Sequence, residues 1–244
     1  MGLLSSPGAA IRLVLLSQVV LAGAIVWMDL RDSRGTAAPG MFAPPTDGPS
    51  VRPYRPDLGP AEPGAPAMRP MSSELDFSIV GGAIRLSGQI AGGDADRFAR
   101  WFDENRPAET LIWLDSSGGS VADALAIGRT IRAARLDTEV ADGSVCLSAC
   151  PYILAGGVNR SASEGAVVGV HQHFFGKNTL LPAFMAVRDV QRAQASVMDY
   201  LGEMGVDLRL MSYALRTPPE DIHLLDSAEM TALKLTTDAG ADPA

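Results

Sequence analysis

Residues 146–150 read Cys146-Leu-Ser-Ala-Cys150, and Ser148 at their centre lies where a strand-like pattern gives way to a helical one. Upstream, residues 110–115 form a short apolar run bounded by turn residues, which predicts a buried strand. That run leads into Gly118-Gly119, where missing side chains let backbone N–H groups face a substrate. Downstream, the apolar run 166–170 leads into His171. A serine, backbone donors and a histidine are the parts of an acyl-transfer site.

Three motifs together resemble the Clp protease proteolytic-subunit family of the crotonase superfamily. They are Asp115-Ser-Ser-Gly-Gly119, Ser148 followed by a small residue, and Gly169-Val-His-Gln172. In that family a similar Gly-Gly turn supplies the oxyanion hole, and a serine at a helix start is the nucleophile. A histidine follows at a separation similar to that between Ser148 and His171. The resemblance covers about residues 75–237 and departs from the family at Ser117, where proline is usual.

The resemblance implies a role for each of these residues. Ser148 is the expected nucleophile, and His171 is the expected base, since an imidazole titrates near neutral pH. The expected oxyanion donors are the N–H groups of Ala149 and of Gly118 or Gly119. Two plainer interpretations stay open: Ser148 is a helix-capping serine, and His171 is a buried core histidine. His173, two residues further on, is the rival candidate for the base.

In a Ser-His-acid catalytic triad a carboxylate orients the histidine, and the sequence defines this acid less well than the serine and the histidine. In the resembled family an aspartate shortly precedes a final Ser-Ala-x-Glu helix, which Ser227-Ala-Glu-Met230 resembles here. The strictest alignment places His223 where that acid should stand. A two-residue shift selects Asp221, which we predict as the acid; the alternatives are Asp226 and Glu220. A Ser-Lys dyad is disfavoured, because the only lysines, Lys177 and Lys234, fall in no matching motif.

Cys146 and Cys150 flank the serine four residues apart. Outside the cytoplasm a disulfide between them is chemically permitted. The geometry is marginal within one regular helix, but Cys146 is expected to precede the helix. The alternatives are two buried small side chains, a metal pair, for which no third ligand lies nearby, or a cysteine nucleophile. We predict no metal, nucleotide or other cofactor.

The N-terminal part predicts an anchor and a linker. Residues 11–28 are apolar except for Arg12, Ser17 and Gln18, and as a helix they would span about 27 Å, enough for a bilayer core. We predict an uncleaved transmembrane anchor within residues 1–34; a cleaved signal peptide is the alternative. More than half of the chain's 17 prolines fall between Pro39 and Pro70, so residues 35–73 are predicted to be a disordered, extended linker.

Residues 74–238 are predicted to form one globular domain, followed by a tail over 239–244. Two runs in which apolar and polar residues alternate lie on either side of Gly81-Gly82, and this pattern predicts a β-hairpin. Beyond it, strands alternate with helices, which is typical of an α/β fold with crossovers around parallel sheets. With the resemblance, the expected fold is a Clp-protease/crotonase-like spiral of β-β-α units. The predicted later elements are helices at 94–106, 121–135, 148–156, 182–204 and 208–215, and a strand at 138–141. Asp94 is expected to cap the first of these helices, and Gly118-Gly119 is expected to form a loop.

Charge and composition restrict the partners. The chain has 28 acidic and 20 basic residues, a net charge of −8, and an acidic surface repels the phosphates of nucleic acids. The predicted function is a membrane-tethered, periplasmic or extracytoplasmic serine hydrolase acting on a peptide or protein substrate. The alternatives are an inactive interaction or scaffold domain of the same fold and a crotonase-type acyl-CoA enzyme. We also expect a homo-oligomer, with the apolar face of helix 182–204 as a candidate interface.

Overall fold

The computed structural model describes residues 7–32, 51–53, 71–173 and 183–237. The chain divides into two compact units, residues 1–46 and 47–244. The first contains helix α1 (Pro7–Asp32). Within the described residues, no helix was found that combines the length and the apolar character needed to cross a membrane.

The second unit is an α/β fold built on a mixed sheet, as the sequence predicts. Five neighbouring strand pairs run parallel (β3/β4, β4/β5, β4/β6, β5/β7 and β6/β8), and β1/β9, β2/β3 and β8/β9 run antiparallel. The strands are β1 (Val51–Pro53), β2 (Asp76–Val80), β3 (Ala83–Ile90), β4 (Leu111–Gly119), β5 (Asp137–Val140), β6 (Val145–Leu147), β7 (Arg160–Ala162), β8 (Val167–Val170) and β9 (Asp221–Leu225).

Strand β4 belongs to two groups of strands. Its first half, Leu111–Trp113, pairs with β5, which pairs with β7. In its second half Ser116 pairs with Cys146 of β6, which continues to β8 and β9. The sheet therefore branches at β4, and its glycine-bearing end lies beside the strand that precedes Ser148.

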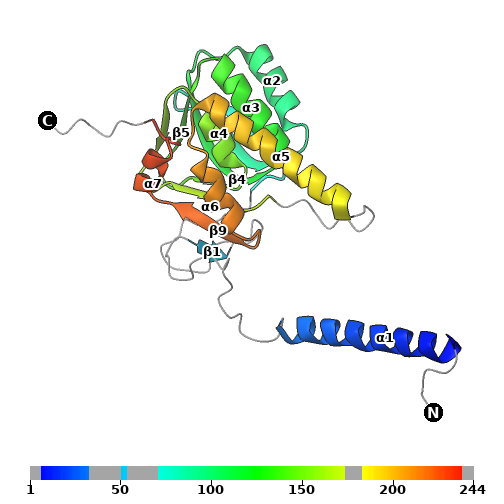
Figure 1. Cartoon of the computed structure of the whole chain (residues 1–244). Helices are drawn as coiled ribbons and strands as arrows, with labels where there is room; N and C mark the ends of the chain where they lie inside the picture. Colours follow the sequence, from blue (N-terminus) through cyan, green and yellow to red (C-terminus); the bar gives the residue numbers. More distant parts are fainter. Residues whose placement is uncertain (1–6, 33–50, 54–70, 174–182, 238–244) are drawn as a thin grey trace. The chain divides into compact units, whose positions relative to one another are not determined.

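Six helices of this unit are described: α2 (Asp94–Asn105), α3 (Val121–Ala133), α4 (Cys150–Gly156), α5 (Ala183–Met204), α6 (Arg209–Arg216) and α7 (Ser227–Ala232). Helix α4 packs against α3 and α5 and against strands β4, β5 and β6 (Figure 1). The main core joins helix residues such as Phe98, Ile127 and Ile153 to strand residues such as Leu86 and Leu114. This packing fixes the helix that follows Ser148.

Close backbone approach holds α4 in place. A Cβ on Gly156 would lie 2.5 Å from the carbonyl oxygen of Gly128 on α3, so the two helices touch at glycines. The guanidinium of Arg132, also on α3, donates to the carbonyls of Ala155, Gly156 and Gly157. These bonds satisfy acceptors that the C-terminal end of a helix otherwise leaves unpaired.

Four details differ from the sequence prediction. Residues 51–53, inside the predicted disordered linker, form β1 and pair with β9. Strand β4 continues through Gly118-Gly119, which the sequence suggested as a loop. Asp94 lies inside α2, whose N-cap is Gly93; its carboxylate instead accepts the N–H groups of Leu75 and Ala91. Helix α4 begins at Cys150, two residues later than predicted.

Candidate active site

Ser148 occupies the tight turn between β6 and α4. Its φ is 60°, in the left-handed region that side chains with a Cβ rarely adopt. Its N–H donates to the carbonyl of Gly169 on β8 at 2.9 Å. Ala149, not Ser148, is the N-cap of α4, and no side chain caps that helix. The helix-capping interpretation of Ser148 is therefore wrong. A sharp turn from strand to helix exposes the serine hydroxyl for reaction.

The hydroxyl of Ser148 meets the imidazole of His171. Ser148 Oγ lies 2.8 Å from His171 Nε2. The parallel register of β6 and β8 pairs Leu147 with Gly169, so the two strands end at the same edge of the sheet. This pairing explains how residues distant in sequence come into contact, as the motif spacing predicts.

The surroundings keep the His171 imidazole neutral. His171 is buried, and this burial, together with the neighbouring His173, lowers its pKa from 6.5 to about 4, although a hydrogen bond with the Gln172 backbone opposes the shift. At neutral pH the ring is uncharged. With its proton on Nδ1, Nε2 can accept the proton of the Ser148 hydroxyl.

Gly118, the first glycine of the pair, lies against the serine turn. A Cβ on Gly118 would lie 2.5 Å from the Ser148 Cβ and 2.9 Å from the Ala149 nitrogen. Only glycine therefore fits beside this turn. The Gly118 N–H donates to Ser116 Oγ at 3.1 Å. Within the described residues the Ala149 N–H makes no hydrogen bond, so Ala149 is the better-placed donor of the predicted set.

At position 119 a glycine is needed because of a different neighbour, Ile90. The φ of Gly119 is 144°, and a Cβ there would lie 2.2 Å from the carbonyl oxygen of Ile90 on β3. The structure thus assigns the two glycines separate packing constraints. Gly118 allows the approach to Ser148, and Gly119 allows the approach of β4 to β3.

The candidate carboxylates lie on or beside β9. Among the described residues, no hydrogen bond or ion pair joins Asp221, Asp226 or Glu220 to His171. Asp226 instead caps α7, where its Oδ1 accepts the Glu229 N–H at 2.7 Å. Asp221 is the first residue of β9. Its assignment as the acid stays a prediction.

His223, at the aligned position of the acid, lies on the strand next to His171. It pairs with Val170 across β8 and β9. Its ring lies 4.6 Å from the Tyr213 ring, centroid to centroid, and its Nε2 is 3.4 Å from Glu229 Oε1. These contacts connect β9 to α6 and α7.

Sequence reasoning missed how the segment after β8 is held. The Tyr152 hydroxyl lies 2.8 Å from His173 Nε2, which joins this segment to α4. Gln172 bonds the end of α6 through its N–H to the Thr217 carbonyl and through its side chain to the Leu215 carbonyl. Gln172 and His173 directly follow His171 in the sequence, and that nearness was the available signal.

Cys146 and Cys150 are joined by a disulfide, with an S–S distance of 2.06 Å. Their Cα atoms are 5.0 Å apart, within the usual range for disulfides. Cys146 lies in β6 and Cys150 begins α4, so the bond spans the turn that carries Ser148. This arrangement is one of the alternatives that the sequence left open.

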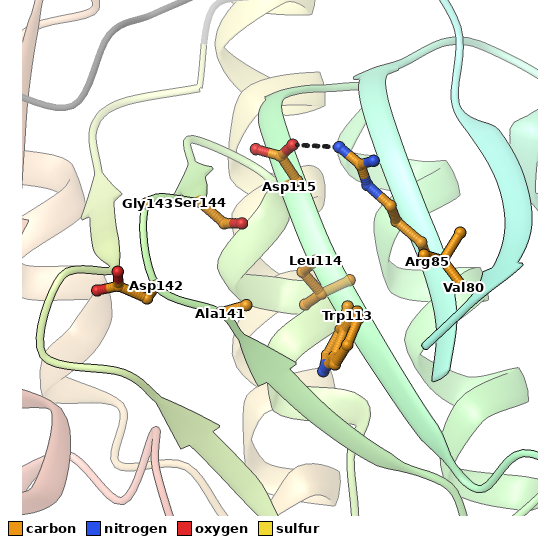
Figure 2. A pocket seen from close by; sticks show the side chains of 9 residues that line it. All are labelled: Val80, Arg85, Trp113, Leu114, Asp115, Ala141, Asp142, Gly143 and Ser144. Atoms are coloured by element: carbon orange, nitrogen blue, oxygen red, sulfur yellow. Dashed lines mark hydrogen bonds and ion pairs between the residues drawn. The ribbon is translucent and has the colours of Figure 1, made fainter. Parts of the chain in front are cut away.

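A separate pocket of about 240 Å³ lies along β4 before the glycine pair. Its wall includes the ion pair of Arg85 and Asp115, 3.1 Å apart (Figure 2). Asp115 is almost fully buried and also lies 3.4 Å from the Val145 nitrogen. The pocket is lined by Val80, Arg85, Trp113, Leu114, Asp115, Ala141, Asp142, Gly143 and Ser144. Neither Ser148 nor His171 lines it.

Sequence comparisons with known proteins do not assign the chain to a family. No protein-family model matches the chain, and no curated protein matches its sequence. Among the described residues, no group of three or more His, Cys, Asp or Glu side chains is placed to hold a metal ion.

Proposed function

We propose that this protein is a serine hydrolase that acts on peptide or protein substrates. The observation that carries the proposal is the 2.8 Å contact between Ser148 Oγ and a buried, neutral His171 Nε2. The left-handed backbone of Ser148 adds support, because strained residues cluster at functional sites.

The reaction is ordinary acyl transfer. Ser148 Oγ attacks the substrate carbonyl while its proton passes to His171 Nε2. Backbone N–H groups of Ala149 and of the Gly118-Gly119 segment stabilise the negative oxygen of the tetrahedral intermediate. His171 then gives the proton to the leaving group, and water releases the acyl group by the same steps in reverse. Asp221 is the proposed orienting acid.

The fold supports the same proposal. We infer a spiral of the Clp-protease/crotonase type, because β4 is shared between two branches of the sheet and ends at the serine turn. The disulfide supports a periplasmic or other extracytoplasmic location, since such bonds persist mainly in oxidising compartments. A homo-oligomer is part of the proposal, and light scattering of the purified protein tests it.

A fluorophosphonate probe tests the proposed nucleophile. This reagent phosphonylates activated serines, so wild-type protein should be labelled and Ser148→Ala should not. Ser144→Ala is the matched control, since Ser144 lies on the same segment but lines the separate pocket; it should label at the wild-type rate. Absence of labelling in folded wild-type protein would favour an inactive scaffold, and equal labelling of Ser148→Ala would remove Ser148 from the mechanism.

A further inference from the structure

The two halves of the Cys146–Cys150 disulfide are attached to rigid elements. Cys146 is the central residue of β6 and pairs with Ser116 of β4 and Val168 of β8. Cys150 is the first residue of α4, whose far end Arg132 caps. Both cysteines are fully buried. The disulfide therefore fixes the start of the helix to the middle of the sheet, and only three residues lie between the two sulfur-bearing positions.

Ser148 is the central one of these three residues, and its backbone is the unfavourable part of the turn. A residue with a Cβ at a φ of 60° persists only where the surrounding structure holds it there. The Ser148 Cβ also faces Gly118, where an added methyl group would collide with it. A small relaxation of this turn would move Oγ away from His171 Nε2.

The disulfide is poorly suited to stabilising the whole fold. Its sequence separation is four residues, so it closes a very short loop. The entropy that a cross-link removes from the unfolded chain falls as the loop becomes shorter. Its main effect is therefore local, on the turn that it spans.

We propose that the Cys146–Cys150 disulfide is a positioning device that holds Ser148 in its reactive turn, so that hydrolase activity depends reversibly on its oxidation. The inference rests on the proposed function of Ser148. A dithiol would reduce the bond by supplying two electrons and two protons. The products are two cysteine thiols and the oxidised, cyclic dithiol. The freed turn then relaxes toward an ordinary backbone conformation, and the Ser148–His171 contact is lost.

The test measures the rate of fluorophosphonate labelling of the full-length protein before and after treatment with dithiothreitol. Thiol titration counts the reduced cysteines, and circular dichroism monitors the fold. We expect labelling to slow by about tenfold to a hundredfold on reduction, the range that corresponds to releasing a strained backbone conformation. Removal of the dithiol and reoxidation should restore the original rate.

If dithiothreitol does not reduce the buried disulfide, a variant without both cysteines provides the same test. Cys146→Ala/Cys150→Ala should label as slowly as the reduced wild-type protein, and dithiothreitol should not change its rate. If the reduced protein or the double variant is labelled at the same rate as the oxidised protein, the inference is overturned and the proposed function is left intact. Absence of labelling in the oxidised protein would instead overturn the proposed function. Unfolding of both forms without the bond would assign the disulfide to global stability and also overturn the inference.

Discussion

At the residue scale, the site depends on a histidine whose charge is removed by burial. His171 has its pKa lowered to about 4, first by desolvation and then by His173. Burial also lowers the pKa of His173 itself. Both rings are therefore neutral at the pH where a general base must accept a proton. The nearby Tyr152 hydroxyl holds His173 in place, so the pair of histidines is part of one packed arrangement.

The pH dependence of labelling follows from this lowered pKa. Only neutral His171 can accept the Ser148 proton, so the labelling rate should rise with pH through about 4 and be level by neutral pH. A rising limb centred on the ordinary value of 6.5 would show that His171 is solvated in the working enzyme or is not the base.

Stability should respond to pH in the same direction. The pKa of His171 is lower in the folded chain than in the unfolded chain, so between about 4 and 6.5 the unfolded chain binds more protons. The contribution of neutral His171 to stability is therefore present above 6.5 and is lost as the pH falls toward about 4. Comparison of urea unfolding for wild type and His171→Gln separates this contribution from that of the carboxylates.

At the element scale, the position of α4 depends on its contact with α3. A Cβ on Gly128 would lie 1.9 Å from the Tyr200 hydroxyl oxygen, and that hydroxyl donates to the Tyr152 carbonyl on α4 at 2.6 Å. Gly128→Ala should lower the free energy of unfolding by about 1–3 kcal/mol through overpacking. It should also slow fluorophosphonate labelling, because α4 carries the cysteine that anchors the serine turn.

Gly202→Ala is the matched control for this variant. Gly202 is exposed on α5, and nothing lies within 4 Å of an added Cβ. This substitution should raise the free energy of unfolding by about 0.5–1 kcal/mol through helix propensity and leave labelling unchanged. Denaturant unfolding of the two variants measures both effects. Equal stability of the two alanine variants would contradict the assigned role of the Gly128 contact.

The elements were predictable from the sequence wherever local chemistry sets the conformation. Gly81 and Gly82 have φ values of 61° and 81°, as a two-residue hairpin turn requires, and β2 and β3 pair across them. The start of α4 was not predictable, because Ser148 adopts a conformation that its own side chain disfavours. The neighbouring strands and the disulfide hold that turn, and neither appears in a local pattern of hydrophobic residues.

At the scale of the whole molecule, the resemblance and its motif spacing predicted that Ser148 and His171 act together. Their contact forms because both residues directly follow the parallel strands β6 and β8. The choice of Asp221 as the acid stays a prediction, and the sequence gives less support for it, because β9 runs antiparallel to its neighbour β8 and is joined to it by a long connection. Strand β1 was missed. A proline-rich composition predicts extended backbone, but it carries no information about which sheet edge an extended segment pairs with.

The N-terminal unit and the disulfide together make a prediction about cellular location. If residues 1–46 direct the chain out of the cytoplasm, the full-length protein expressed in bacteria should have Cys146 and Cys150 oxidised. A chain that begins at residue 47, the boundary of the second unit, should remain in the cytoplasm, where thiols are kept reduced. Alkylation of free thiols at lysis, followed by mass spectrometry of the denatured proteins, should detect two modified cysteines in the truncated chain and none in the full chain. Equal modification of the two would contradict an export role for residues 1–46, because the oxidation state would then not depend on them.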